Sequence, residues 1–241
     1  MSRLRAWAPV IWLQLFAPVY GVTEEQVREH RFNVLLDGKP IGEHRFVVRD
    51  LGGERRVSSE ASFDVRMLFI PVYSYRHTNS ESWRDGCLRR IESETDSNGK
   101  PYRVVGEDRG GEFTLSTQAG NRTYTGRCVM SFAYWDQQML QQDRLLNAQT
   151  GELVDVEIDP LGSRPVELGE GSVVADVFRI TSASDDDIDI NIFYEQETGQ
   201  WLSLESVLEN GRVMRYLPTD FGEVVMAGGE SAGQGGRGGR L

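Results

Sequence analysis

The chain has 241 residues, of which 39% are hydrophobic, enough to bury one good-sized core. Its 37 acidic residues outnumber its 26 basic residues and give a formal net charge of −11. Nucleic-acid binding is therefore not expected, because affinity for a phosphate backbone depends on clustered Lys and Arg.

The first 21 residues have the pattern of a secretory signal peptide. Arg3 and Arg5 precede an apolar run over residues 6–20, which ends in Val19-Tyr20-Gly21. Small residues in this position favour cleavage after Gly21, and the run is shorter than the roughly 20 residues of a typical membrane span. We expect a periplasmic or secreted protein with no stable membrane span after cleavage. An uncleaved anchor is the alternative.

The segments beside the expected domain differ from it in composition. Residues 22–28 are predicted to be an N-terminal linker. Residues 227–241 contain seven Gly and one apolar side chain larger than Ala. Such a segment cannot offset its ordering entropy by burial, so we predict a disordered tail.

Turn dipeptides recur at strand-length intervals over residues 29–226. Asp85-Gly86 and Asn98-Gly99 are typical of tight hairpins, and the segments between turns are rich in β-branched and aromatic residues. No stretch between strands is long enough for a helical crossover. The sequence predicts one all-β domain, a mainly antiparallel meander of about a dozen strands. A sheet of that size must curl into a barrel, half-barrel or sandwich.

One segment departs from the strand pattern. In residues 131–142, Phe132, Trp135 and Met139 recur at helical spacing, and Ser131 or Asp136 is available as an N-cap. We predict one short helix or ordered loop here. It would fill an open end of the curled sheet or, alternatively, act as a lid over a binding site.

Several strings of the sequence match a known pattern. They are residues 34–44, residues 68–77 with Glu81, Trp83, Asp85 and Gly86, residues 95–99, residues 134–135 and residues 146–151. These strings resemble a family of uncharacterised secreted bacterial proteins known only as a domain of unknown function. The resemblance covers most of residues 29–217. It implies an exported β-rich domain and carries over no catalytic residue.

The standard catalytic and cofactor motifs are missing from the sequence. There is no Gly-x-Ser-x-Gly elbow and no phosphate-binding Gly-x-x-x-x-Gly-Lys loop. Asp185, Asp187 and Asp189 imitate the start of a calcium loop, but Ile190 stands where a Gly must turn the chain. We therefore predict no catalytic set, no cofactor and no metal site.

His30 and His44 are the closest pair of histidines in the sequence. A hairpin turning through Gly38-Lys39 places them three to five residues apart in register, or roughly 10 to 16 Å. That distance is too long for a shared metal ion. Each is interpreted as an ordinary strand residue.

Cys87 and Cys128 are the only cysteines. In an exported chain they are candidates for a disulfide, which would close a loop of about 40 residues and contribute roughly 3 to 4 kcal/mol. Two free buried thiols are the alternative. The sequence does not decide between them.

Two tight turns predict a register for the strands around residues 72–106. Asp85-Gly86 places His77 opposite Glu94, and Asn98-Gly99 places Glu94 opposite Arg103. We expect Glu94 to raise the pKa of His77 modestly, because Arg103 competes for the same carboxylate. One sheet face would then carry Tyr73, Tyr75, His77, Asn79, Glu81, Arg90, Glu92, Glu94 and Arg103.

This polar face has two interpretations. It is a surface salt ladder, or it lines the inside of the curled sheet with the apolar run of residues 67–72 as a rim. The second interpretation gives these candidate ligand-binding residues: Tyr73, Tyr75, His77, Glu81, Trp83, Glu94, Arg103 and Trp135.

Three functions are compatible with these patterns. The first is a non-catalytic carrier or sensor of a small amphipathic or lipid-like ligand in the cup of the sheet. The second is an envelope module that binds protein or glycan, with Trp83, Trp135 and Trp201 exposed. The third is an enzyme in which His77 acts as a base oriented by Glu94.

Export can be tested by intact-mass analysis of the protein made in its native host. We expect a mature chain that begins near Val22, because the apolar run ends at a cleavable Val-Tyr-Gly. A full-length cytosolic product that begins at Met1 would contradict this prediction.

Overall fold

The computed structural model describes residues 25–67, 70–126, 128–168, 171–182, 188–208, 211–219 and 224–226. The predicted signal peptide, the Gly-rich tail, the Asp185 and Asp187 positions and part of the expected apolar rim lie outside these residues. The first strand begins at Gln26, so residues 26–28 belong to the sheet rather than to a linker. No helix in the described ranges is long and apolar enough to cross a membrane.

The described residues form fifteen strands and one short 3₁₀ helix. The elements are β1 (Gln26–Leu36), β2 (Lys39–Asp50), β3 (Glu54–Met67), β4 (Ile70–Arg84), β5 (Cys87–Ser97), β6 (Lys100–Asp108), β7 (Glu112–Thr117), β8 (Gly120–Thr125), η1 (Gln137–Gln141), β9 (Arg144–Leu146), β10 (Leu153–Leu168), β11 (Gly171–Ser182), β12 (Asp189–Glu195), β13 (Trp201–Val207), β14 (Val213–Pro218) and β15 (Val224–Met226).

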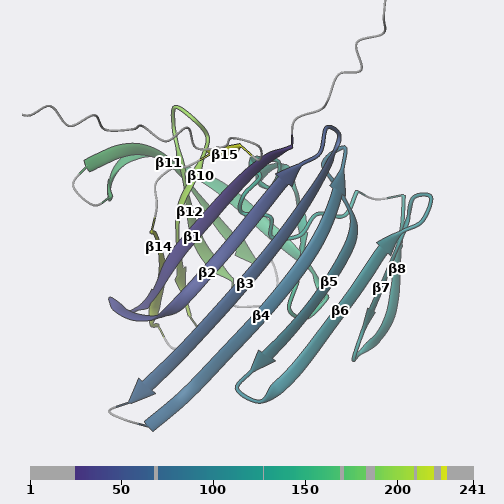
Figure 1. Cartoon of the computed structure of the whole chain (residues 1–241), viewed down its shortest axis with the longest axis horizontal. Helices are drawn as coiled ribbons and strands as arrows, with labels where there is room; N and C mark the ends of the chain where they lie inside the picture. Colours follow the sequence, from purple (N-terminus) through teal and green to yellow (C-terminus); the bar gives the residue numbers. More distant parts are fainter. Residues whose placement is uncertain are drawn as a thin grey trace, which may run out of the picture.

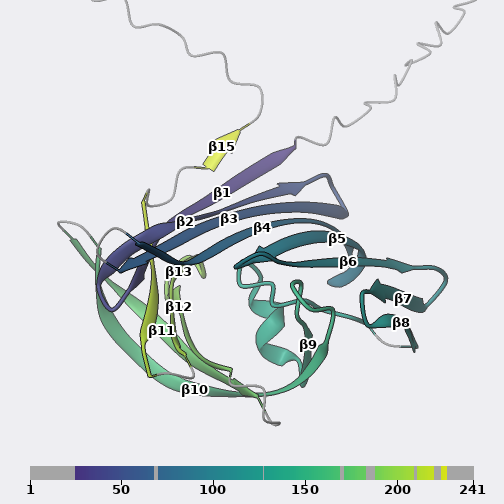
Figure 2. The same cartoon turned by 90° about the horizontal axis from the view of Figure 1, so that it is seen from below.

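The strands make one sheet in which neighbours in space are mostly neighbours in sequence (Figure 1). The spatial order runs from β8 back to β1, continues through β14 and then runs back to β9, while β15 pairs with β1. All pairs of these strands are antiparallel. The predicted all-β antiparallel meander is confirmed. Figure 2 shows the sheet curled around a concave side.

Three hairpin turns have the backbone that their residues predict. Asp37-Gly38, Asp85-Gly86 and Asn98-Gly99 all have positive φ at both positions, between 49° and 81°. This is the conformation of type I′ turns, whose twist matches that of the flanking strands. The short turns keep consecutive strands paired along the chain.

The two ends of the strand order, β8 and β9, do not pair with each other. Residues 128–143, which we call the plug, connect them and lie on the concave side of the sheet (Figure 2). Only η1 is helical, and the Asp136 carboxylate caps it by accepting the Gln138 N–H at 2.9 Å. The buried plug residues are Val129, Met130, Ser131, Ala133 and Met139.

The predicted helix over residues 131–142 is therefore shorter than expected. Residues 131–136 form irregular turns instead, such as the bond from the Asp136 N–H to the Ala133 carbonyl at 2.8 Å. Of the apolar side chains at helical spacing, Met139 is fully buried, and Phe132 and Trp135 are partly buried and pack against the core. A segment shaped by its surroundings need not keep helical geometry.

A disulfide ties the start of the plug to the β4–β5 hairpin. Cys87 and Cys128 are bonded, with their Cα atoms 5.1 Å apart. The next residues are also joined, since the Leu88 N–H donates to the Val129 carbonyl at 2.9 Å. The sequence separation of 41 residues corresponds to a stabilisation of about 4 kcal/mol in the chain-entropy model.

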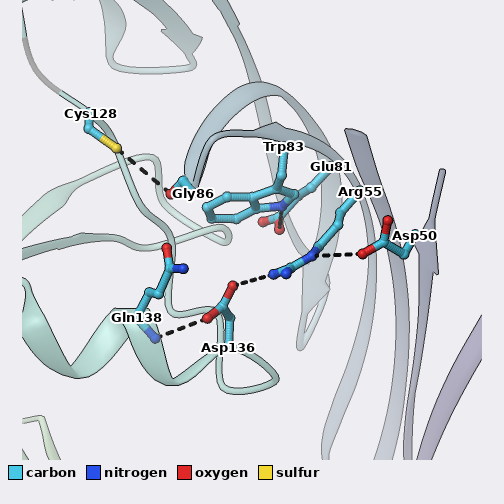
Figure 3. Close-up of polar contacts among 8 residues, drawn as sticks. All are labelled: Asp50, Arg55, Glu81, Trp83, Gly86, Cys128, Asp136 and Gln138. Carbon is cyan, nitrogen blue, oxygen red and sulfur yellow. Dashed lines mark hydrogen bonds and ion pairs between the residues drawn. The ribbon is translucent and has the colours of Figure 1, made fainter. Parts of the chain in front are cut away.

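The middle of the plug is held by Arg55 on β3 (Figure 3). The Arg55 Nη1 lies 2.7 Å from the Asp136 Oδ2, and its Nε lies 3.4 Å from Asp50 on β2. The guanidinium also lies 5.9 Å from the ring centroid of Trp135, which packs edge-on against Trp83 at 5.4 Å. Arg55 thus contacts two consecutive residues of the plug.

Replacing Arg55 tests how much this ion pair holds the plug. The Asp136 side chain is only 10% exposed, so Arg55→Met leaves a mostly buried carboxylate without its partner. We expect a loss of about 1 to 2 kcal/mol in the free energy of unfolding, measured by urea denaturation.

The neighbouring Arg56 provides a matched control. Its side chain is 64% exposed and pairs with Glu54 in solvent, so Arg56→Met should change stability by less than about 0.5 kcal/mol. Equal losses for the two variants would show that Arg55 contributes no more than a surface charge.

Candidate functional site

A cavity of about 260 Å³ lies between the inner face of β2–β4 and the plug. Its walls are His44 and Phe46 on β2, Val57 and Ser59 on β3, Tyr75, His77, Asn79 and Glu81 on β4, Ser131, Phe132, Tyr134 and Trp135 in the plug, Asn147, Ala148 and Gln149 after β9, Ile188 and Ile190 at β12, and Tyr216 on β14. The sheet supplies most of the polar groups, and the plug supplies three aromatic rings.

Strand β4 brings four polar or aromatic side chains to this cavity by its alternation. Tyr75, His77, Asn79 and Glu81 are two residues apart, so all four point to the concave side. His77 is 8% exposed and Glu81 5% exposed. The prediction that these residues share one sheet face agrees with their place in the cavity.

The predicted row of His77, Glu94 and Arg103 is wrong. The register shifts between Ser82 and Trp83, because β5 carries a bulge at Arg89. One extra residue moves every later β5 side chain to the other face. His77 consequently lies opposite Thr95 rather than Glu94, and Glu94 is exposed on the convex side.

The second predicted hairpin register is correct. Glu94 pairs with Arg103 across β5 and β6 and forms an ion pair with it. Arg103 also lies 2.7 Å from Glu92, with its side chain 52% exposed. These charges form a ladder on the outer surface and take no part in the cavity.

The eight predicted site residues thus separate into three groups. Tyr75, His77, Glu81 and Trp135 line the cavity. Trp83 is 2% exposed, and its indole N–H donates to the carboxyl group of Glu81. The others lie elsewhere: Glu94 and Arg103 on the outer face, and Tyr73, which is 36% exposed and whose hydroxyl lies 3.1 Å from the Ser97 hydroxyl.

Glu81 is a buried carboxyl group held by neutral donors. The Asn79 Nδ2 and the Trp83 Nε1 donate to its two oxygens, each at 2.9 Å. Ser131 in the plug makes a further side-chain hydrogen bond to it. Burial raises the pKa of Glu81, and these three bonds oppose that rise in part.

His77 is bonded to Thr95 rather than to a carboxylate. Its Nδ1 lies 2.8 Å from the Thr95 hydroxyl, and its ring stacks on Tyr75 at 6.1 Å. Burial lowers the pKa of His77 to about 4, so the ring is neutral at pH 7. The expected rise in this pKa depended on Glu94, which is on the other face.

His44 is a cavity residue that the sequence did not reveal as one. Its Nδ1 lies 3.1 Å from the hydroxyl of Tyr216, a residue 172 positions away. Its ring stacks on Phe46 with centroids 4.1 Å apart. Burial, with a smaller contribution from the nearby His77, lowers the pKa of His44 to about 3. Two neutral imidazoles therefore line one cavity.

The expected separation of His30 and His44 is also corrected. His30 pairs with Phe46 and His44 with Phe32, so the two histidines are two residues apart in register rather than three to five. The turn is centred on Asp37-Gly38, and a bulge follows near Gly42. In the described part of the chain, no three His, Cys, Asp or Glu residues are grouped as metal ligands.

Residues 32–219 match the protein family described as a domain of unknown function, DUF6134. The chain belongs to this family. The predicted membership of a family known only as a domain of unknown function is confirmed. The secreted bacterial character of this family stays a prediction. No match to a curated protein was found.

The fold of this chain is similar to that of a solved structure described as a β-barrel-like protein of domain of unknown function DUF1849 from Brucella abortus. The TM-score is 0.57 at 12% identity, over 80% of this chain and 95% of that chain. At such identity the likeness concerns the fold alone.

The buried His77 predicts a loss of stability in mild acid. Its folded pKa of about 4 lies below the unfolded value near 6.5, so between these values the unfolded chain binds the proton more readily. The stability that the neutral His77 contributes is fully present above pH 6.5 and is lost as the pH falls toward 4. We expect urea denaturation to show that wild type loses about 2 kcal/mol more than His77→Gln between pH 8 and pH 5.

The neighbouring Thr78 gives the control, because its side chain points to the exposed convex side. Thr78→Gln should keep the pH dependence of the wild type. A His77→Gln variant with that same dependence would show that His77 binds its proton as readily in the folded state as in the unfolded state.

Proposed function

We propose that this DUF6134 chain is an exported, non-catalytic binding domain that holds a small amphipathic ligand in the cavity between β2–β4 and the plug. The observation that carries this proposal is the combination of an aromatic wall with buried neutral polar groups around one cavity. Ligand sites are typically apolar clefts with a few placed polar groups.

The volume sets the size of the ligand. At about 260 Å³, the cavity lies just below the range of roughly 300 to 1,000 Å³ typical of sites for drug-sized ligands. It suits a small molecule, or the polar head and first carbons of a longer lipid-like chain. The rings of Phe46, Tyr75, Phe132 and Tyr134 would cover the apolar body.

Export is supported by the signal-like N-terminus and by the Cys87–Cys128 disulfide. Disulfides persist mainly in oxidising compartments such as the periplasm. A soluble carrier or sensor in that compartment needs no membrane span of its own once the signal segment is removed.

The two other candidate functions have less support. An envelope module that binds through exposed tryptophans is disfavoured, because Trp83 and Trp201 are each 2% exposed. The hypothesis of an enzyme with His77 as a base required Glu94 to orient the His77 ring. The bulge in β5 places these two residues on opposite faces of the sheet.

Binding can be measured with N-phenyl-1-naphthylamine, a small neutral dye whose fluorescence rises in apolar surroundings. We expect the purified domain to bind it, and Ser59→Phe to abolish binding by filling the cavity that Ser59 lines. Native mass spectrometry of protein from its own host should show a bound small molecule that the variant lacks.

Ser58→Phe is the matched control, since Ser58 is the exposed neighbour on the convex side. It should bind the dye as the wild type does. The proposal is wrong if the wild type carries no ligand and binds no dye, or if Ser59→Phe binds both unchanged while folded by circular dichroism.

A further inference from the structure

His44, which lines the cavity, has a buried hydrogen-bond donor without a partner among the described residues. The described residues offer the Tyr216 hydroxyl one side-chain partner, the Nδ1 of His44 at 3.1 Å. A buried hydroxyl donates where it can, so the Tyr216 O–H donates to Nδ1. The ring proton of the neutral His44 is then on Nε2, which is buried and has no partner among the described residues.

Asn79, a second residue that lines the cavity, has a buried acceptor without a partner among the described residues. The Asn79 Nδ2 donates to Glu81, and this fixes the amide so that Oδ1 points away from the carboxyl group. That Oδ1 is buried and has no hydrogen-bond partner in the described chain. Leaving a buried polar atom unsatisfied is costly, so such atoms indicate where a ligand supplies the missing bond.

The cavity compensates a charged ligand poorly. The described lining residues include no Lys or Arg, so an anion would be buried uncompensated. Glu81 is the single acidic residue among them, and its oxygens already accept bonds from Asn79, Trp83 and Ser131. A carboxylate has about four acceptor positions, so about one is left for the three N–H donors of an ammonium group, and the burial of that charge would be compensated only in part.

We infer that the cavity selects an uncharged head group with both an acceptor, for the His44 Nε2–H, and a donor, for the Asn79 Oδ1, such as a primary carboxamide. This inference rests on the proposed binding function and specifies its ligand class. His44 and Asn79 are on different strands, with Ser59 and Ala61 on β3 between them. Because β3 separates the strands of His44 and Asn79, a head group with its donor and acceptor on separate atoms reaches both side chains better than a single hydroxyl oxygen does.

Four six-carbon probes separate the head groups while keeping the apolar body constant: hexanamide, 1-hexanol, hexanoate and hexylammonium. Each competes at pH 7.5 with bound N-phenyl-1-naphthylamine. We expect hexanamide to displace the dye at a concentration at least roughly 10-fold lower than hexanoate or hexylammonium. 1-Hexanol should be intermediate, because one oxygen must serve both protein atoms.

His44→Phe removes the donor but keeps a ring stacked on Phe46. This substitution should weaken the binding of hexanamide roughly 10-fold while it changes the affinity for the dye less than about threefold. His30→Phe is the matched control, because His30 is a half-buried strand histidine outside the cavity lining. It should change neither affinity.

The outcomes distinguish this inference from the function on which it rests. Hexanoate or hexylammonium displacing the dye as well as hexanamide would overturn the inference and leave a binding cavity of different selectivity. A wild type that binds no dye would overturn the proposed function and the inference with it. The head-group series uses the wild type alone, so it decides even if His44→Phe fails to fold.

Discussion

The curled sheet depends on one constraint: its two end strands, β8 and β9, do not pair with each other. An unclosed sheet leaves its apolar inner face open unless another segment covers it. The plug provides that cover, because it is the connection between the two unpaired ends. Met139 in the plug is fully buried, and a side chain of that size contributes about 1.5 to 3 kcal/mol when removed from water.

Local turn chemistry explains why much of the fold could be predicted. Asp85-Gly86 and Asn98-Gly99 adopt the positive φ angles of type I′ turns, and the register of β5 with β6 follows from the second of them. The pairing of β1 with β14 could not be predicted in this way. It joins segments about 180 residues apart, and no local pattern specifies such a contact. The opening between β8 and β9 is equally non-local.

Half of the site could be predicted for a similar reason. Alternation along β4 placed Tyr75, His77 and Glu81 together, since period 2 holds within a strand. The prediction failed at Arg89, where a single bulged residue reverses the faces of β5. Neither residue type nor spacing marked that bulge in the sequence. His44 was missed because its partner, Tyr216, comes from β14 on the other side of the unpredicted β1–β14 contact.

The chemistry of the cavity differs from what stability alone would favour. A concave face covered by a plug is most stable when it is apolar, and replacing buried polar groups by apolar ones of similar size is often neutral or stabilising. Here the same face carries Glu81, His77 and the His44 Nε2, which has no hydrogen-bond partner within the described ranges. Each lowers stability through lost hydration that the protein compensates only in part. Local rules of stability are typically broken at functional sites, so the positions of these polar groups support the binding cavity that we propose.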